Sequence, residues 1–453
     1  MRQRTKIALA AAAFVAVIVA VACSEWYGHI HAIRSLASAG WEVGVAPPNE
    51  SEWRFVAEAY FESQEDQWEP DTITHLTNVW WLRTLWIDGG RIKSGDLRRL
   101  AKLRGLEDLR IDSSGITNSG LRHVGRFRRL DALYLTNMAI DDEGVATLRL
   151  PADLKMLGFD NTRVGNATAN QVSRLENLRW LNFGGTRISD EGVACVARMT
   201  ELENLDLSST AVSDDGLEHI RSLTRLRRLR LAHTAVTDEG LKHLSAIVGL
   251  EFLVLDDTRV NGTGVADLSE LESFGLEMRG CTIDAEGAVG ISKASGLVNL
   301  DLEDATIDDD VVTEICNLEK LERLNLAGTL TTDVGAKNTC SRLNLRELSL
   351  SRTRVTTQGF GDLRNMTSLR KLDLSDTAVD DHLLLHTLGM QGRVVLLLRN
   401  TEITDSGIAA LIAAATPSRP LPELDVIDLT GTKVTPAGAE QLEARLPECL
   451  VLH

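Results

Sequence analysis

The chain has 453 residues, of which 43% are hydrophobic but only 4% aromatic, and its formal net charge is −17. Nucleic-acid binding and contact with an anionic lipid surface both depend on clustered Lys and Arg, so an acidic excess of this size argues against either partner. The six cysteines form no C-x-x-C pair and match no zinc spacing with histidine, which argues against a zinc site and a disulfide framework.

Residues 1–23 are predicted to be an export or anchoring segment. Three basic residues precede an uncharged run that ends at Cys23. The run has the shortest length that still spans a bilayer, and the charges before it predict a cytoplasmic N-terminus and a single-pass anchor. Two alternatives stay open: a signal peptide cleaved after the A-V-A at 20–22, which would leave a secreted chain, and a lipoprotein lipidated at Cys23. All three place residues 24–453 across the membrane, and the two anchored forms keep them in the cell envelope.

Residues 24–81 are interpreted as a linker and a Trp-rich N-terminal cap. Six of the eight tryptophans lie between residues 41 and 86: Trp41, Trp53, Trp68, Trp80, Trp81 and Trp86. An open stack of repeats exposes an apolar end, which these rings are expected to cover. A helix is expected over Glu52–Phe61. A carbohydrate-binding aromatic site is the alternative interpretation.

Residues 82–445 repeat the pattern L-x-x-L-x-L-x-x-T-x-V-T-D-x-G-L-x-x-L about 15 times at a spacing of 24. Alternating leucines such as Leu229 and Leu231 predict a short strand with one buried face. The ninth-position Thr is expected to bond to the backbone of the neighbouring turn, and the S/T-D pair to cap a helix. The recurring Gly is expected to let neighbouring coils approach. Because one unit cannot bury its own apolar face, each must stack on the next, with residues 446–453 as the C-terminal cap.

This pattern resembles the leucine-rich repeat superfamily, and its T-x-V-T-D-x-G-L segment is similar to the cysteine-containing repeats of F-box proteins. The apolar start and 24-residue units together resemble bacterial envelope-anchored repeat proteins. The resemblance implies an α/β solenoid, a horseshoe with a parallel concave sheet and convex helices, here preceded by one N-terminal hydrophobic helix. It implies protein recognition and no fixed catalytic residues. An inserted proline-rich segment, residues 415–423, is expected to form a loop outside the stack.

Strand positions that point away from the core would line the concave face. Three aromatic or apolar residues fall on successive strands there, and arginines follow, which is the composition of an interface hot spot. The candidate partner-binding residues are Tyr134, Met156, Trp180, Arg228, Arg230 and Phe252, and the alternative is that they are isolated exposed side chains of the kind that surfaces tolerate. An acidic stretch, Asp256 to Asp304, follows them and is interpreted as a solvated face, with a basic partner or a cation as the alternative.

No residue pattern indicates catalysis, a cofactor or a metal. His382 and His386 have a metal-compatible spacing, but no third ligand is evident, and they are interpreted as exposed helix residues. The sequence therefore predicts a non-enzymatic recognition scaffold that binds a protein partner. The alternatives are a structural envelope component that self-associates through its helices and a substrate-recognition subunit resembling F-box leucine-rich repeat proteins.

Overall fold

The computed structural model describes residues 42–46, 56–62, 72–77, 82–88, 92–112, 115–342, 344–361, 363, 366–390 and 392–453. The chain forms two compact units, Met1–Arg187 and Ile188–His453, and each is described by itself. Among the described residues, no helix is long and apolar enough to cross a membrane. The predicted membrane segment at 1–23 lies outside them, as do Trp41, Trp53, Trp68, Trp80 and Trp81 of the predicted cap.

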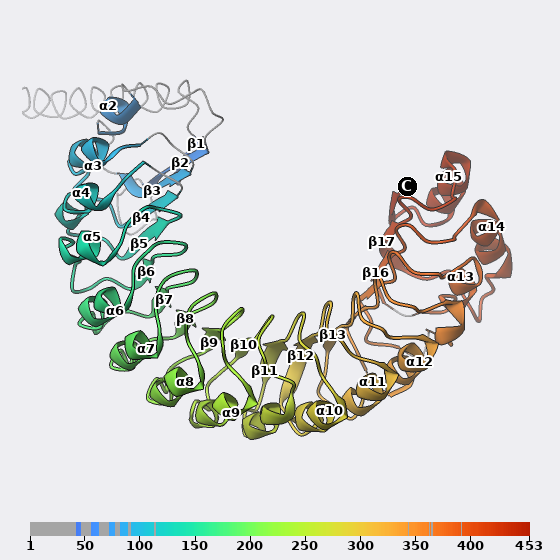
Figure 1. Ribbon diagram of the computed structural model, residues 1–453. Helices are drawn as coiled ribbons and strands as arrows, with labels where there is room; N and C mark the ends of the chain where they lie inside the picture. The colour runs from blue at the N-terminus through green and yellow to red at the C-terminus, as the bar shows by residue number, and fades with distance from the viewer. Residues whose placement is uncertain are drawn as a thin grey trace, which may run out of the picture. The chain divides into compact units, whose positions relative to one another are not determined.

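The first unit places strands along one face and helices along the other (Figure 1). Its elements are β1 (Glu42–Ala46), β2 (Val56–Glu62), α2 (Thr72–Thr77), β3 (Leu82–Asp88), α3 (Ser94–Leu100), β4 (Asp108–Asp112), α4 (Asn118–Leu121), η1 (Val124–Arg126), β5 (Ala132–Thr136), α5 (Asp142–Ala146), β6 (Met156–Gly158), α6 (Asn166–Val172) and β7 (Trp180–Asn182). β1 and β2 are antiparallel, and each later strand pairs in parallel with the one before it.

The helix expected over Glu52–Phe61 is wrong. Residues Val56–Glu62 form strand β2, which pairs in parallel with β3 and places Ala59 opposite Leu85. The sequence VAEAYFE is rich in β-branched and aromatic residues, and the first repeat strand offers it an edge with unpaired backbone groups. The backbone pairing gained at that edge therefore outweighs the tendency to form a helix that the local sequence spacing suggested.

The second unit repeats the same strand and helix alternation. Its elements are α7 (Asp190–Val196), β8 (Asn204–Asp206), α8 (Asp214–Ile220), β9 (Arg228–Arg230), α9 (Asp238–Leu241), η2 (Lys242–Ala246), β10 (Phe252–Val254), η3 (Thr263–Leu268), β11 (Phe274–Glu277), α10 (Ala285–Ser292), β12 (Leu297–Asp301), α11 (Asp309–Ile315), β13 (Arg323–Asn325), α12 (Asp333–Arg342), β14 (Glu347–Ser349), η4 (Thr357–Gly359), β15 (Lys371–Asp373), α13 (His382–His386), β16 (Val394–Leu397), α14 (Asp405–Ala414), β17 (Leu424–Asp428), α15 (Pro436–Arg445) and β18 (Leu450–Leu452). β8 to β18 pair in parallel in chain order.

The period of the sequence sets the register of the sheet. Leu229 pairs with Leu205 on one side and with Leu253 on the other, each 24 residues away. These leucines are almost completely buried. The inserted segment 415–423 does not interrupt the sheet, because β16 and β17 still pair in parallel across it, with a register shift between Val394 and Val395. The insert turns back on itself between Thr416 and Arg419.

Each ninth-position threonine forms its hydrogen bond within its own 24-residue repeat. This corrects the expected bond to the neighbouring turn. In all ten units with Thr at this place, Oγ1 donates to the carbonyl three residues earlier, as Thr353 does to Leu350 at 2.5 Å. The bond between neighbouring turns comes instead from the preceding residue, which has positive φ. Ser209, for example, has a φ of 55° and donates its N–H to Ala232 O at 2.7 Å.

The expected helix cap of the S/T-D pair is confirmed for its threonine where Thr237 and Thr404 accept from backbone N–H groups of their own helices. The aspartate of the pair binds the next repeat instead of its own helix. The Asp214 carboxylate accepts from Thr237 N at 2.8 Å and from Thr237 Oγ1 at 2.7 Å. The same pair of bonds joins Asp190 to Ser213, Asp309 to Thr332, Asp333 to Thr356, Asp381 to Thr404 and Asp405 to Thr435. We call this series of contacts the Asp ladder. It satisfies helix N-termini that the chain must cap.

The recurring glycine makes room for the ladder. A Cβ on Gly240 would lie 2.4 Å from Asp214 Oδ1, and one on Gly407 would lie 2.4 Å from Asp381 Oδ1. Real Cβ atoms essentially never approach so closely, so a side chain at this position would push the carboxylate away. The expectation that this Gly permits close approach is thus confirmed, and its partner is the ladder aspartate.

Candidate functional site

The predicted binding residues fall into two groups, because Tyr134, Met156 and Trp180 belong to the first unit and the other three to the second. In β5, Leu133 and Leu135 are buried while Tyr134 between them is half-buried on the opposite face. We call the face of the sheet that bears Tyr134 the strand face. Met156 and Trp180 are also half-buried and are opposite each other in the pairing of β6 with β7.

The three residues of the first unit are in contact. The Tyr134 hydroxyl lies 3.5 Å from Met156 Sδ, and the Tyr134 and Trp180 ring centroids are 5.1 Å apart at an interplanar angle of 56°. This is the tilted geometry that aromatic pairs favour. The sequence prediction that these side chains form one cluster describes their geometry correctly, while their role in binding stays a prediction.

A glycine between the two rings lets them meet. Gly158 lies on β6, between the strands of Tyr134 and Trp180, and is opposite Tyr134 in the pairing. A Cβ there would lie 3.1 Å from Tyr134 Cδ1 and 3.2 Å from the Trp180 ring. Any larger residue would occupy the space over which the rings approach each other.

The cluster extends to two residues that the sequence prediction left out. The Arg110 guanidinium lies 4.6 Å from the Tyr134 ring centroid and 5.8 Å from that of Trp86, which is 40% exposed. Asp108 orients this guanidinium through a 2.9 Å ion pair. Trp86, Arg110, Tyr134, Met156 and Trp180 thus form a continuous strip across β3 to β7, which we call the aromatic row. Trp86 and Arg110 occupy the same outward-facing strand position as Tyr134, so the alternating pattern of the sequence could have identified them.

The Tyr134 phenol is the titratable group at the centre of the aromatic row. Burial raises the pKa of the Tyr134 phenol, and the nearby Asp108 and Asp160 add to this while Arg110 opposes it. The hydroxyl therefore stays protonated and available as a hydrogen-bond donor. Aromatic rings and a guanidinium stacked together are the side chains most enriched in protein-binding hot spots.

In the second unit, Arg228, Arg230 and Phe252 lie on neighbouring strands. Both arginines are exposed on β9, and Phe252 on β10 is opposite Arg228 in the pairing. The Phe252 ring extends over Gly275 of β11, whose added Cβ would lie 2.9 Å from Phe252 Cδ2. As at Gly158, the glycine leaves room for an aromatic ring that points away from the core.

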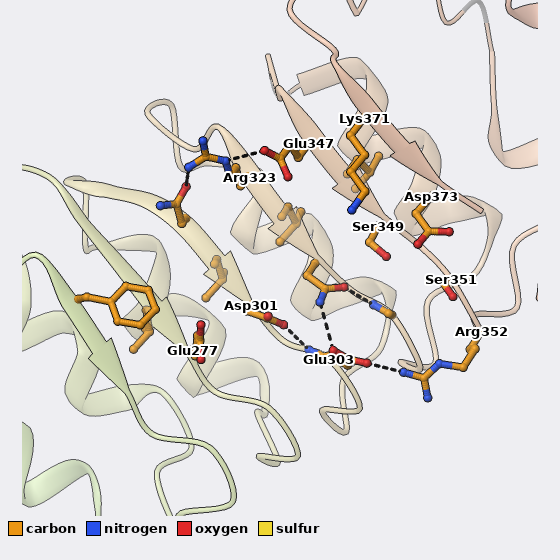
Figure 2. Close-up of a pocket in the computed structure, with 18 residues that line it drawn as sticks. Glu277, Asp301, Glu303, Arg323, Glu347, Ser349, Ser351, Arg352, Lys371 and Asp373 are labelled. Atoms are coloured by element: carbon orange, nitrogen blue, oxygen red, sulfur yellow. Dashed lines mark hydrogen bonds and ion pairs between the residues drawn. The ribbon is translucent and has the colours of Figure 1, made fainter. Parts of the chain in front are cut away.

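Phe252 lies at one end of a groove of about 460 Å³ that runs over β10 to β15 (Figure 2). Charged side chains of both signs line it, and several are paired. Arg323 contacts Glu347 at 2.8 Å, and Arg352 contacts Glu303 at 2.7 Å. Lys371 and Asp373 lie near one another at the far end in Figure 2. The groove therefore combines an apolar end with a polar floor.

Three residues of the predicted acidic stretch, Glu277, Asp301 and Glu303, line this groove. Burial raises the pKa of the Asp256 and Glu277 carboxyls, and the Asp301 charge adds to both shifts while Arg279 opposes them. Arg279 lies 2.7 Å from Asp301, so the stretch is partly neutralised from within. No group of three or more metal-ligating side chains occurs among the described residues. His382 is highly exposed and its Nδ1 lies 3.3 Å from Asp380 Oδ1.

Comparisons with known proteins address the fold. A leucine-rich repeat family matches residues 222–245, and no curated protein matches the sequence. The structure of TLR13 in complex with ssRNA13 is similar with a TM-score of 0.55 and 17% identity, covering 83% of this chain and 60% of that one. An internalin from Listeria monocytogenes has a TM-score of 0.44 and 16% identity, covering 81% and 85% of the two chains. A Leptospira interrogans leucine-rich repeat protein has a TM-score of 0.47 and 16% identity, covering 84% and 92%.

At these identities the similarity concerns the fold alone. It agrees with the parallel strands, the alternating helices and the in-register leucines described above. The protein has the fold of a leucine-rich repeat solenoid, and one of its repeats, at residues 222–245, matches a leucine-rich repeat family.

Proposed function

We propose that the protein is a non-enzymatic recognition scaffold that binds a protein partner through its strand face. The aromatic row carries this proposal. Five side chains from strands β3 to β7 form one partly exposed strip of aromatic, thioether and guanidinium groups. Its three aromatic rings offer large apolar area with few rotamers to immobilise, which suits a protein surface better than a small substrate.

The leucine-rich repeat fold is consistent with a protein-interaction scaffold. Its strands present a long series of outward positions that can vary while the core positions repeat. We further propose that the segment at 1–23 exports the chain and holds it at the membrane. The basic residues before an apolar run in the sequence support this second step.

Partner capture with paired variants tests the proposal. The full chain is compared with Tyr134→Ala/Trp180→Ala and with a control, Lys242→Ala/Lys293→Ala, which removes two exposed side chains at helix ends in the second unit. A photo-crosslinking side chain introduced at Met156 marks proteins that lie directly on the row.

A protein that crosslinks at Met156 and is captured by the parent and the control, but lost by at least tenfold with the aromatic variant, supports binding at the row. Capture that survives the aromatic variant would refute that site. The capture is run with untreated extract and with extract treated with ribonuclease. The structurally similar TLR13 is in complex with ssRNA13, which makes RNA the alternative occupant. Capture abolished by ribonuclease would refute a protein partner.

A further inference from the structure

Charge is divided unevenly along this acidic chain. Residues 92–187 contain 16 Lys and Arg against 11 Asp and Glu, whereas residues 188–453 contain 25 against 43. The net charge of −17 therefore describes the second unit and conceals a basic region in the first. An argument from total charge against anionic partners does not apply to each surface separately.

The excess positive charge lies at the helix ends of the first three repeats. Six exposed side chains, which we call the basic patch, follow the helical turns of α3, of α4 with η1, and of α5: Arg98, Arg99, Lys102, Arg122, Arg126 and Arg149. None of the six forms an ion pair within the part of the chain that the structure describes. Positions 24 residues apart along the following repeats carry Ala146, Asn170, Ala194 and Glu218 in place of Arg98 and Arg122, so the patch is local.

The six residues come from helices that pack directly on one another. A Cβ on Gly120 of α4 would lie 2.8 Å from Ser94 Oγ of α3, and one on Gly125 would lie 3.1 Å from Arg149 Cβ. His123 lies within the patch. Burial lowers its pKa, and the Arg122, Arg126 and Arg98 charges lower it further.

Two acidic side chains of the same helices are engaged elsewhere, whereas Glu143 is exposed in the first turn of α5. Asp96 accepts from the Lys93 N–H at 3.0 Å, and Asp142 accepts from Gly165 N at 2.8 Å. Both lie in the first turns of their helices, while the basic residues lie at the last turns. The patch therefore faces solvent with little neutralisation from its own helices.

The patch has no apolar anchor. Within the described part of residues 82–187, Trp86 is the only exposed large hydrophobic residue, and it lies on the strand face; Phe127 between the patch helices is buried. A specific protein interface is built around buried aromatic or aliphatic anchors, and single-stranded nucleic acid is held by stacking on aromatic rings. A broad array of cations with neither feature matches a surface that presents many anionic groups in a plane.

We propose that the basic patch binds a membrane surface rich in anionic phospholipid headgroups. Guanidinium groups donate paired hydrogen bonds to phosphate oxygens, and clustered cations are attracted to anionic membrane surfaces. The position of the patch in the chain supports this occupant. It lies on the first repeats after the apolar segment at 1–23, so that one segment and one charged surface would act together as two membrane signals. This inference is independent of the protein partner proposed for the aromatic row.

The test compares membrane partitioning of the full chain on two vesicle types. One contains phosphatidylcholine alone, and the other contains about one third phosphatidylglycerol. The ratio of the two partition coefficients cancels the contribution of the apolar segment. The patch variant is Arg98→Gln/Arg122→Gln/Arg126→Gln. The matched control, Arg198→Gln/Arg221→Gln/Lys293→Gln, removes the same number of exposed cations from helix ends in the second unit.

We expect the parent and the control to prefer the anionic vesicles, and the patch variant to lose about a hundredfold of that preference, since each cation contributes about fivefold. Added salt should reduce the preference of the parent. An equal preference in parent and patch variant, with thermal unfolding showing both to be folded, would overturn the proposal. Tighter binding of the parent to a single-stranded RNA oligonucleotide than to the anionic vesicles would also overturn it and assign the patch to nucleic acid.

Discussion

Removal of one ladder aspartate should loosen the repeat that follows it. Asp214→Ala deletes two hydrogen bonds to a charged acceptor, at 2.8 Å from Thr237 N and 2.7 Å from Thr237 Oγ1. Bonds to charged groups contribute about 1.5–3 kcal/mol each, but water can reach this half-buried site and replace part of that. We expect a loss of about 2–3 kcal/mol in local stability.

The contact between Gly240 and the Asp214 carboxylate can be tested with a double-mutant cycle. Gly240→Ala alone should cost about 1–3 kcal/mol, because its Cβ would lie 2.4 Å from Asp214 Oδ1. In the Asp214→Ala background that clash is gone, and the nearest remaining atom is Leu217 Cδ1 at 3.0 Å, at the end of a flexible side chain. There Gly240→Ala should be neutral or stabilising, because Ala favours a helix over Gly by about 1 kcal/mol.

Hydrogen exchange is the suitable assay, because a repeat protein can open one unit at a time and need not unfold in a single step. The amides of residues 233–244 report the bond at Thr237 directly. We expect a coupling energy of about 2 kcal/mol or more between the two substitutions. Additive effects within about 0.5 kcal/mol would refute the claim that the aspartate is what requires a glycine at this position.

Two further predictions concern backbone strain and proton binding. Ser209 has a φ of 55°, which disfavours a side chain, so Ser209→Gly should stabilise the fold by about 0.5 kcal/mol; a lower thermal midpoint would contradict this. The folded structure lowers the pKa of His123 below 6.5, so the unfolded chain binds a proton at this imidazole more readily than the folded chain does. The free energy of unfolding is therefore highest above pH 6.5 and decreases as the pH falls towards the pKa of the folded state. His123→Asn should therefore reduce the drop in thermal midpoint on acidification, and an unchanged drop, together with a His123 titration by NMR at or above 6.5, would show the reasoning to be wrong.

The sequence predicts the repeating part of this fold well, because each unit meets the same neighbours. A spacing of 24 places Leu229 between Leu205 and Leu253, and the structure pairs them so. Even the segment TLTTDVGAKNTC, which departs most from the pattern, keeps the ladder, with Asp309 bound to Thr332 and Thr331 fully buried in the β-branched position. Periodicity is informative here since it restates one packing problem many times.

The pattern does not say whether a polar group bonds within its own unit or to the next. The ninth-position Thr and the ladder Asp recur with equal regularity, yet Thr353 bonds to Leu350 of its own turn while Asp333 bonds to Thr356 of the following unit. A period of 24 fits both arrangements, and only the direction of the side chain separates them. The Val56–Glu62 strand was missed for a related reason, since its partner edge is the strand of the first repeat, more than 20 residues further along the chain.

The candidate site shows a second limit of prediction from the repeat pattern. Repeating positions fix the scaffold, so the residues that distinguish surfaces are those that break the repeat. Gly158 and Gly275 are strand positions where a missing side chain seats a neighbouring ring, and neither belongs to the repeated glycine of the Asp ladder. The basic patch likewise ends where the period would continue it, at Ala146 and Asn170. Functional surfaces on such a chain are therefore best sought by subtracting the repeat from the sequence and asking which departures lie together in space, and both the aromatic row and the basic patch satisfy that condition.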